Sequence, residues 1–263
     1  MTTDATFPDQ TAALPDGRTM PLLGFGTWQI KGDDARAAVG WALEAGYRHL
    51  DTATVYGNEA EVGAALKASG VDRDDVFITT KMPGGGTGRE TETLHKSLDR
   101  LGTDRVDLWL IHWPNDDAAD VPMWQALIDA HKQGQARAIG VSNYSLAMID
   151  ELVSATGVTP AVNQIEWSPL LFDRATLDGH RARGIVVEGY SALRGGTLEH
   201  PGIVEIAGRH GKSPAQVIIR WHLQHGIVVI PKSVRRERIV ENAAVTDFEL
   251  TDADMTAMDG VGT

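Results

Sequence analysis

The sequence predicts an α/β fold, arranged as an eight-stranded parallel (β/α)8 barrel of the TIM-barrel type. Three observations lead to this prediction. Short apolar runs recur along the chain, amphipathic stretches of helical length separate them, and eight such units fill most of the 263 residues. Runs that are apolar throughout are typical of parallel strands buried on both faces. Strands that alternate with helices predict a parallel sheet, and roughly 250 residues suit a closed barrel of eight units.

The predicted elements begin with a hairpin, in which residues 11–14 and 19–22 flank the turn sequence Pro-Asp-Gly-Arg. The glycine-marked run at residues 23–27 comes next and is the first predicted barrel strand. The other seven, each rich in Val, Ile or Leu, are residues 47–50, 76–80, 106–111, 136–141, 161–165, 185–187 and 226–230.

Helical patterns lie between these runs. The first, residues 33–45, is expected to begin at Asp33 and to end at Gly46. The others are residues 59–68, 89–101, 122–132, 146–155, 173–183, 213–224, 235–243 and 252–258. Ser213 and Pro214 form a typical helix start, because serine caps the first turn and proline suits the first helical position. A doubly wound open sheet is the alternative, but Gln29 stands where its dinucleotide fingerprint requires a third glycine.

Composition limits the function. With 42% apolar and 23% charged residues the chain is globular, and the absence of cysteine excludes disulfides, cysteine-ligated zinc and a cysteine nucleophile. A net charge of -12 argues against nucleic-acid and anionic-membrane partners, so any anion must bind at a local basic cluster. The sequence shows no secretory signal and no membrane-spanning run, which predicts a cytoplasmic protein. Residues 1–10 are expected to form a flexible tail and residues 11–263 a single domain.

Polar side chains follow almost every predicted strand. Because the active sites of such barrels lie at the carboxyl ends of the strands, these residues form the candidate site. They are Asp51, Lys81, His112, Ser142, Asn143, Gln164, Glu166, Glu188, Tyr190, Lys232 and Ser233. Any one of them is also explained by a buried strand that emerges into a polar loop.

Four residues, Asp51, Tyr56, Lys81 and His112, together suit the reduction of a carbonyl group. A free tyrosine is a weak acid, and the ammonium group of Lys81 would make the Tyr56 phenol a better proton donor. Asp51 can hold Lys81 in place, and His112 can orient a carbonyl oxygen and stabilise its developing charge. Taken singly, each residue also has a structural explanation. Asp51 is consistent with a helix cap and Tyr56 with an aromatic residue packed in a loop. Lys81 is consistent with a solvated lysine and His112 with a hydrogen-bonded core histidine.

Three sequence blocks carry a resemblance to a known family. The first is GYRHLDTA at 46–53 with YGNE at 56–59, and the second is VDLWLIHWP at 106–114 with IGVSN at 139–143. The third is IPKSV at 230–234 with Arg238, Glu241 and Asn242. Together they resemble the aldo-keto reductase family, in its bacterial diketogluconate-reductase-like branch, from about residue 11 to residue 258. The resemblance implies a barrel capped by the N-terminal hairpin and the reversible NADPH-dependent reduction of aldehydes and ketones to alcohols.

The resemblance also implies roles for individual residues. Asp51, Tyr56, Lys81 and His112 would be the catalytic tetrad, with Tyr56 as the proton donor. The residues implied to bind NADPH are Gly26, Thr27, Trp28, Ser142, Asn143, Gln164, Tyr190, Ser191, Leu193, Lys232, Ser233, Arg238, Glu241 and Asn242. The residues from Gly26 to Tyr190 in this list would surround the nicotinamide. Ser191 and Leu193 would contact the pyrophosphate. The residues from Lys232 to Asn242 would bind the adenosine with its 2′-phosphate. No metal is expected.

A basic cluster of Lys232, Arg235, Arg236 and Arg238 contrasts with the acidic chain. Alone it is consistent with a basic helix start on the surface. With the family resemblance it favours NADPH over NADH, because only NADPH carries the 2′-phosphate that such groups bind well.

The sequence departs from the usual family pattern in three places. Trp167, Ser168 and Pro169 stand where a histidine-proline pair is often found, residues 82–88 are unusually rich in glycine, and the chain ends soon after the last predicted helix. Many relatives carry a longer C-terminal loop, so an open pocket and a broad substrate range are expected. The candidate substrate residues are Trp28, Tyr56, His112 and Trp113. The other tryptophans in helix or strand runs, Trp41, Trp109, Trp124 and Trp221, are expected in the core.

Two other functions stay open at this point. One is a cofactor-binding regulatory protein on the same barrel with little turnover. The other is a metal-dependent hydrolase, which the lack of a His-x-His pair at a strand end opposes. The expected partner is a small carbonyl compound, with sugar-derived ketones, dicarbonyls such as methylglyoxal and aromatic aldehydes all open. The protein is expected to be a monomer.

Overall fold

Eight parallel strands form one curled sheet in the structure, a computed structural model that describes residues 10–85, 88–115 and 120–262. They are β3 (Phe25–Gly26), β4 (His49–Asp51), β5 (Phe77–Met82), β6 (Val106–Ile111), β7 (Ala136–Ser142), β8 (Val162–Glu166), β9 (Val186–Tyr190) and β10 (Val228–Val229). Each strand pairs in parallel with the next along the chain, and a bridge between Leu23 and Val229 joins the first strand to the last. This order confirms the predicted barrel and is incompatible with a doubly wound sheet, in which the strand order reverses.

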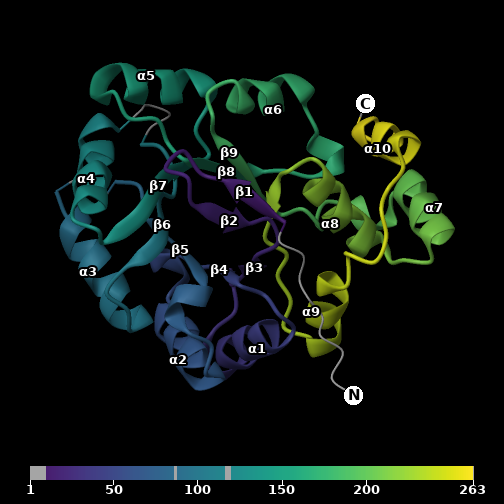
Figure 1. Ribbon diagram of the computed structural model, residues 1–263, viewed down its shortest axis with the longest axis horizontal. Helices are drawn as coiled ribbons and strands as arrows, with labels where there is room; N and C mark the ends of the chain where they lie inside the picture. The colour runs from purple at the N-terminus through teal and green to yellow at the C-terminus, as the bar shows by residue number, and fades with distance from the viewer. Residues whose placement is uncertain (1–9, 86–87, 116–119, 263) are drawn as a thin grey trace.

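The helices surround the sheet, as Figure 1 shows. One helix follows each barrel strand: α1 (Gly32–Glu44), α2 (Glu59–Ser69), α3 (Glu90–Leu101), α4 (Val121–Lys132), α5 (Leu146–Thr156), α6 (Arg174–Arg181), α8 (Pro214–Gln224) and α9 (Arg236–Ala243). Two more, α7 (Pro201–His210) and α10 (Asp252–Asp259), pack against each other outside the ring. Short 3-10 helices are η1 (Thr54–Tyr56), η2 (Arg73–Asp75), η3 (Pro169–Leu171) and η4 (Thr197–Glu199).

The helix prediction is wrong in two details. It missed α7, although Pro201 opens this helix and Gly211 ends it, because one helix per strand was assumed. The first helix begins at Gly32 after Lys31, so Asp33 lies in its first turn and does not cap it. The predicted cap at Ser213 is confirmed, since its side chain accepts a hydrogen bond from the backbone of Gln216.

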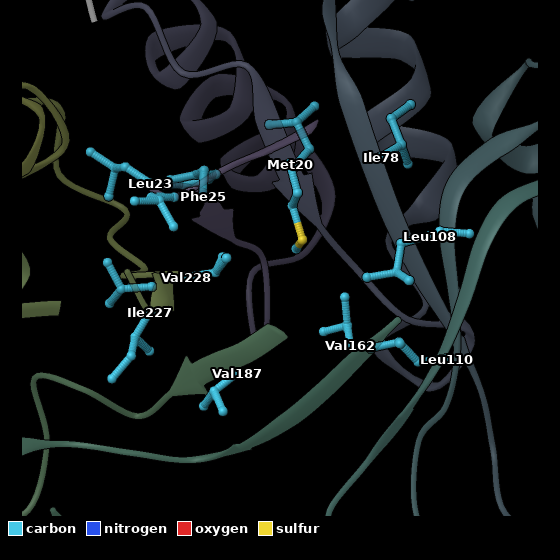
Figure 2. Close-up of a cluster of buried hydrophobic side chains, with 14 of the residues drawn as sticks. Met20, Leu23, Phe25, Ile78, Leu108, Leu110, Val162, Val187, Ile227 and Val228 are labelled. Carbon is cyan, nitrogen blue, oxygen red and sulfur yellow. The ribbon is translucent and has the colours of Figure 1, made fainter. Parts of the chain in front are cut away.

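A two-stranded hairpin covers one end of the barrel (Figure 1). Its strands β1 (Thr11–Ala13) and β2 (Thr19–Pro21) pair antiparallel, and Gly17 takes a left-handed conformation in the turn. Met20 is fully buried and lies with Leu108, Leu110 and Val162 inside the barrel (Figure 2). The hairpin therefore seals this end with apolar side chains. The predicted tail lies, apart from residue 10, outside the described residues.

Three of the four tryptophans expected in the core, Trp109, Trp124 and Trp221, are fully buried there, and Trp41 is partly buried against it. The prediction is therefore confirmed for Trp109, Trp124 and Trp221, whereas Trp41 packs against the core from outside.

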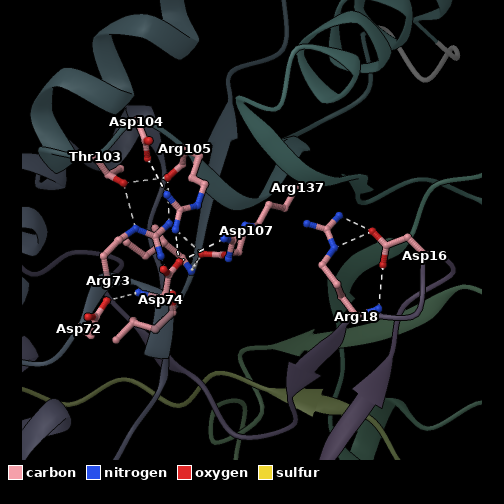
Figure 3. A network of polar contacts seen from close by, with 12 residues as sticks. Asp16, Arg18, Asp72, Arg73, Asp74, Thr103, Asp104, Arg105, Asp107 and Arg137 are labelled. Atoms are coloured by element: carbon pink, nitrogen blue, oxygen red, sulfur yellow. Dashed lines mark hydrogen bonds and ion pairs between the residues drawn. The ribbon is translucent and has the colours of Figure 1, made fainter.

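A network of arginines and aspartates ties the strands together near the hairpin (Figure 3). Asp107 at the start of β6 accepts hydrogen bonds from Arg73 at 2.8 Å, Arg137 at 3.1 Å and the backbone N–H of Ile78 at 2.9 Å. These bonds link β6 to β5 and β7. Arg18, Asp107 and Arg137 also line a surface cavity of about 370 Å³, which lies at the opposite end of the barrel from the polar strand ends.

Gly26 marks a close approach where the barrel closes. A Cβ added at Gly26 would lie 2.7 Å from the carbonyl oxygen of Ile230, a backbone atom that cannot swing away. We expect Gly26→Ala to lower the free energy of unfolding by roughly 1–3 kcal/mol, measured by urea denaturation. Gly40→Ala is the matched control, because a Cβ there meets open space on α1, and it should be neutral or stabilising by about 1 kcal/mol. Equal losses in both variants would contradict the steric explanation.

Candidate active site

The barrel interior at the carboxyl ends of the strands is polar, and a buried ion pair lies at its centre. Lys81 is fully buried, and its Nζ donates to both carboxylate oxygens of Asp51 at 2.7 Å and to the carbonyl of Thr52 at 2.9 Å. The amide of Gln164 donates to Asp51 Oδ2 at 2.9 Å. A buried charge pair needs such additional hydrogen bonds to offset the loss of water. The solvated-lysine interpretation of Lys81 is therefore wrong.

Most of the candidate residues lie within the strands, although the sequence prediction placed most of them after the strand ends. Asp51 belongs to β4, Lys81 to β5, Ser142 to β7, Glu166 to β8, and Glu188 and Tyr190 to β9, whereas Gln164 lies within β8 as predicted. The prediction ended these strands before the polar residues because it assumed a largely apolar interior. The interior is instead polar at this end, and strand alternation points these side chains into it.

Tyr56 lies on η1 beside the buried pair. Its ring centroid is 5.1 Å from Lys81 Nζ and 5.7 Å from the His112 ring, which it meets edge-on at 73°. The hydroxyl of Thr54 donates to the carbonyl of Lys81 at 2.9 Å, which fastens η1 to β5. The structure thus brings Asp51, Tyr56, Lys81 and His112 together, as the sequence predicted.

Asn58 fixes the segment that follows Tyr56. It is fully buried and donates at 2.9 Å to the carbonyls of Thr27 and Ile30, while it accepts a bond from Thr52 at 2.8 Å. Through its side chain, Asn58 thus joins the loop after β3 to the loop after β4, and these bonds fix the position of η1.

Burial dominates the electrostatics of this group. Burial opposes the charge of Lys81 most strongly, but Asp51, Tyr56 and Glu188 together outweigh it and hold the pKa of Lys81 above its ordinary value. Burial also raises the pKa of Tyr56, and the charge of Lys81 offsets this only in part, so the net direction is opposite to the one expected from Lys81 alone. Burial, followed by the charge of Lys81, lowers the pKa of His112 to about 3. The imidazole is therefore neutral near pH 7 and keeps one N–H to donate.

A second polar group adjoins the first. The Tyr190 hydroxyl donates to Asn143 Oδ1 at 2.8 Å, and Asn143 Nδ2 lies 3.2 Å from the His112 carbonyl and 3.0 Å from the Ser142 hydroxyl. Ser142 donates to the carbonyl of Gln164 at 2.9 Å. The residues expected around a nicotinamide are thus contiguous with the tetrad.

Among the residues that the structure describes, three other than glycine adopt left-handed backbone conformations, and all three lie in loops at this end of the barrel. They are Gln29 at φ 63°, Asn143 at φ 64° and Ser191 at φ 58°. Such conformations cost free energy and persist where the surrounding structure requires them, often at functional sites.

Large apolar side chains are exposed beside the polar interior. Trp28 follows β3 and is 43% exposed, and Trp113 follows His112 and is 51% exposed. Thr27 next to Trp28 is fully buried, and its hydroxyl donates to the Asp51 carbonyl at 2.9 Å. Leu193, predicted to contact a pyrophosphate with Ser191, is partly buried against the core in the loop after β9.

The basic cluster lies at the start of α9. Within the described parts of the chain, Lys232 and Arg238 are exposed and make no ion pair, whereas Arg236 pairs with Glu44 at 3.0 Å. A Cβ added at Gly26 would lie 3.7 Å from Lys232 Cβ, so the cluster adjoins the end of β3. Of the other expected cofactor residues, Ser233 precedes the helix and Glu241 and Asn242 lie on it.

Comparison with known proteins decides the family. Residues 22–263 match the model of the Aldo/keto reductase family. The chain belongs to the aldo-keto reductase family. Glyoxal reductase from Bacillus subtilis is 43% identical over 255 residues, which cover 95% of this chain and 92% of that protein. The reductase is therefore an oxidoreductase, and the hydrolase alternative is excluded. The diketogluconate-reductase-like branch stays a prediction.

Solved structures of other aldo-keto reductases resemble the whole barrel. One from Brucella melitensis has a TM-score of 0.92 and 44% identity, with 95% of this chain and 97% of that chain covered. One from Bombyx mori, solved in complex with NADP, has a TM-score of 0.86 and 35% identity, with 95% of this chain and 92% of that chain covered.

Two further residues of this reductase lie at the site: Arg194, which the sequence prediction did not assign to it, and Glu188, to which the sequence prediction gave no role. The guanidinium of Arg194 stacks 4.9 Å from the centroid of Trp28, which joins the loops after β9 and β3. Glu188 on β9 is fully buried inside the barrel. Arg194 carries no motif, but Glu188 had a signal, since it was one of the polar residues next to a predicted strand.

Two departures from the family pattern, Trp167 and the glycine-rich segment 82–88, lie partly or wholly within the described residues. Trp167 is buried, 5.9 Å edge-on from Phe172, and thus belongs to the core. Of the glycine-rich segment, residues 86 and 87 lie outside the described residues. Among the described residues there is no cluster of three or more His, Asp or Glu side chains that would hold a metal, and no helix is long and apolar enough to span a membrane.

Proposed function

We propose that residues 11–263 work as a single NADPH-dependent oxidoreductase domain that reduces small aldehydes and ketones to alcohols. The observation that carries the proposal is the fully buried Lys81–Asp51 pair beside Tyr56 and the neutral His112. A buried ammonium next to a phenol has little structural purpose, but it stabilises the phenolate that remains after proton donation.

The chain's own residues provide the proton and the binding of the carbonyl oxygen. His112 donates a hydrogen bond to that oxygen and orients it toward Tyr56. Tyr56 gives its proton to the oxygen as negative charge develops there, and Lys81, held by Asp51, stabilises the resulting phenolate. NADPH, when bound, supplies the hydride. Tyr56 then recovers a proton from solvent.

The residues around the tetrad fit a nicotinamide dinucleotide. Ser142, Asn143 and Gln164 offer amide and hydroxyl groups for a carboxamide, and Tyr190 offers an aromatic face. Lys232 and Arg238 offer two cations without ion-pair partners in the described part of the chain, just before and within the first turn of α9, where a phosphate is also favoured by the helix dipole. The NADP complex of the Bombyx mori relative supports this choice of cofactor.

For the substrate we propose a small carbonyl compound that lies between Trp28 and Trp113, over Tyr56 and His112. The two exposed indoles offer apolar walls and leave the polar interior for the carbonyl oxygen. The similarity to a glyoxal reductase favours dicarbonyls such as methylglyoxal. All of these residues come from one chain, so we propose that a monomer suffices.

The test is a panel of carbonyl compounds with NADPH, followed at the absorbance of the reduced nicotinamide. The panel contains methylglyoxal, a sugar-derived ketone and an aromatic aldehyde, with NADH in parallel. Oxidation of NADPH that depends on the carbonyl compound is expected. Tight NADPH binding without turnover on any member would instead favour the cofactor-binding regulatory protein.

The basic cluster makes a separate prediction on cofactor choice. Replacing Lys232 or Arg238 alone with alanine is expected to raise the KM for NADPH by roughly 10- to 100-fold, because each charge-assisted bond to phosphate is worth about 1.5–3 kcal/mol. The KM for NADH should change little. Arg236→Ala is the matched control, since Arg236 lies on the same helix but pairs with Glu44. Equal effects on both cofactors would reject a 2′-phosphate site here.

A further inference from the structure

Glu188 is a second buried acid beside the Lys81–Asp51 pair. Its side chain is fully buried, and it pairs in register with Gln164 on β8 and Val228 on β10. Residues at paired positions of parallel strands point to the same face, and Gln164 points into the barrel toward Asp51. Glu188 therefore points into the barrel as well, in the polar interior described above.

Among the described residues, no hydrogen bond of ordinary geometry reaches the carboxyl group of Glu188, although the amide of Gln164 lies close enough to lower its pKa. Within the described residues its one ion-pair contact is His49 Nε2 at 3.6 Å, and this nitrogen lies 3.1 Å from the hydroxyl oxygen of Thr79. Burial lowers the pKa of His49 to about 3, so His49 is neutral and does not balance a carboxylate. A buried acid left in this way is costly when ionised.

The groups that face Glu188 can be named from each neighbouring element. β4 contributes His49 and Asp51, β5 contributes Lys81, and η1 contributes Tyr56. β8 contributes the uncharged amide of Gln164, and β10 the apolar Val228. His222 of α8 packs behind the next residue, Gly189, on the outer face of β9.

Among the groups named here, Lys81 is thus the one cation that faces both Asp51 and Glu188, and it already donates to Asp51 and to Thr52. An ionised Glu188 stabilises the ammonium of Lys81 and raises the pKa of Tyr56. A protonated Glu188 has neither effect. Burial, and after it the charge of Asp51, raises the pKa of Glu188 to about 8, although Gln164 and Lys81 act in the opposite direction.

We propose that Glu188 is a positioning residue for the proposed reaction, and that the charge of its carboxyl, next to the Lys81 ammonium, governs how readily Tyr56 gives up its proton. The inference rests on the proposed function, since it concerns the proton of Tyr56. In alcohol oxidation the phenolate of Tyr56 is the base that accepts a proton. An ionised Glu188 therefore delays oxidation to higher pH, because it makes the phenolate harder to form.

The experiment measures kcat for alcohol oxidation against pH in Glu188→Gln and in the native protein. The quantity compared is the alkaline limb, that is, the pH at which kcat rises as Tyr56 loses its proton. The variant is nearly isosteric and lacks the charge, so its limb is expected about one pH unit lower, the size of shift that one nearby charge produces. Glu188→Asp keeps a carboxyl and should keep the native profile. Glu59→Gln is the matched control, because Glu59 is also buried but bonds Thr80 on the outer face of the barrel. An unmoved limb in Glu188→Gln, even with a lower kcat, would leave Glu188 a packing role only and overturn the proposal.

A second readout needs no turnover. An acid whose pKa is higher in the folded chain binds more protons when folded, so stability falls as pH rises between the two values. For Glu188 that interval runs from 4.5 to about 8. The native protein should therefore lose more thermal stability from about pH 5 to about pH 8 than Glu188→Gln does.

Infrared titration of the native protein covers the case in which the variants fail to fold. We expect a buried protonated carboxyl at neutral pH that loses its proton near pH 8. Its absence at neutral pH would overturn the inference without reference to activity. A native protein that shows this carboxyl but reduces no carbonyl compound would instead count against the proposed function alone.

Discussion

Replacing Tyr56 with phenylalanine is expected to lower kcat for carbonyl reduction by about 10²- to 10⁴-fold, the usual contribution of a positioned general acid. The change removes one hydroxyl and leaves the ring between Lys81 and His112, so NADPH should bind with an unchanged Kd. Single-turnover and steady-state rates with the best carbonyl compound, together with NADPH fluorescence titration, separate the two quantities.

Tyr47→Phe is the control for this experiment. Tyr47 is also buried, and its hydroxyl donates to the carbonyl of Ile239 at 3.2 Å, on α9 and not at the catalytic tetrad. The loss of that bond should lower the free energy of unfolding by about 1 kcal/mol and leave kcat unchanged. Full activity in Tyr56→Phe would reject Tyr56 as the proton donor, whatever the cofactor binding shows.

Replacing Lys81 with methionine is expected to affect both activity and stability. The substitution leaves the Asp51 carboxylate buried without its cation, which typically lowers the free energy of unfolding by about 3–5 kcal/mol. Carbonyl reduction should fall by at least about 10²-fold, because the phenolate of Tyr56 loses the neighbouring charge. Urea denaturation and steady-state kinetics measure the two effects.

The double variant Asp51→Asn with Lys81→Met separates these effects. Without the orphaned charge, much of the lost stability should return, whereas the activity should not. Lys96→Met is the control for loss of a lysine, since its pair with Glu92 is exposed and should contribute about 1 kcal/mol or less. A Lys81→Met variant as stable as the native protein would contradict the buried-pair interpretation.

The fold could be predicted from the sequence because the apolar runs, the helix caps and the turn glycines all indicated the same alternation of strands and helices. Apolar runs such as residues 106–111 match a strand residue for residue, and the caps and glycines between them set the helices. Helix α7 was missed because nothing in a repeating pattern of one helix per strand leaves room for it. Strand ends were misplaced wherever the barrel interior turns polar, since a buried lysine and an exposed one look the same in a sequence.

The site was predictable only in part for the same reason. The family-like blocks brought Asp51, Tyr56, Lys81 and His112 together in the prediction, and the structure places them side by side. The direction of the Tyr56 pKa depends on burial, which no spacing reveals. Glu188 stood in the sequence as one more polar residue after a strand, and only its complete burial distinguishes it from the exposed Glu166.

The closure of the barrel has a consequence for how the fold opens. The seam joins its two shortest strands, β3 and β10, through a few backbone bonds such as Gly24 N–H to the Val229 carbonyl at 2.9 Å and Gly26 N–H to the Pro231 carbonyl at 3.1 Å. This seam is therefore the place where thermal fluctuations would first part the cylinder. The proposed cofactor residues lie on both of its sides, with Gly26 on one and Lys232 on the other. A dinucleotide bound there would contact both sides of the seam. Its binding would therefore stabilise the closed barrel, and opening of the seam would weaken its binding.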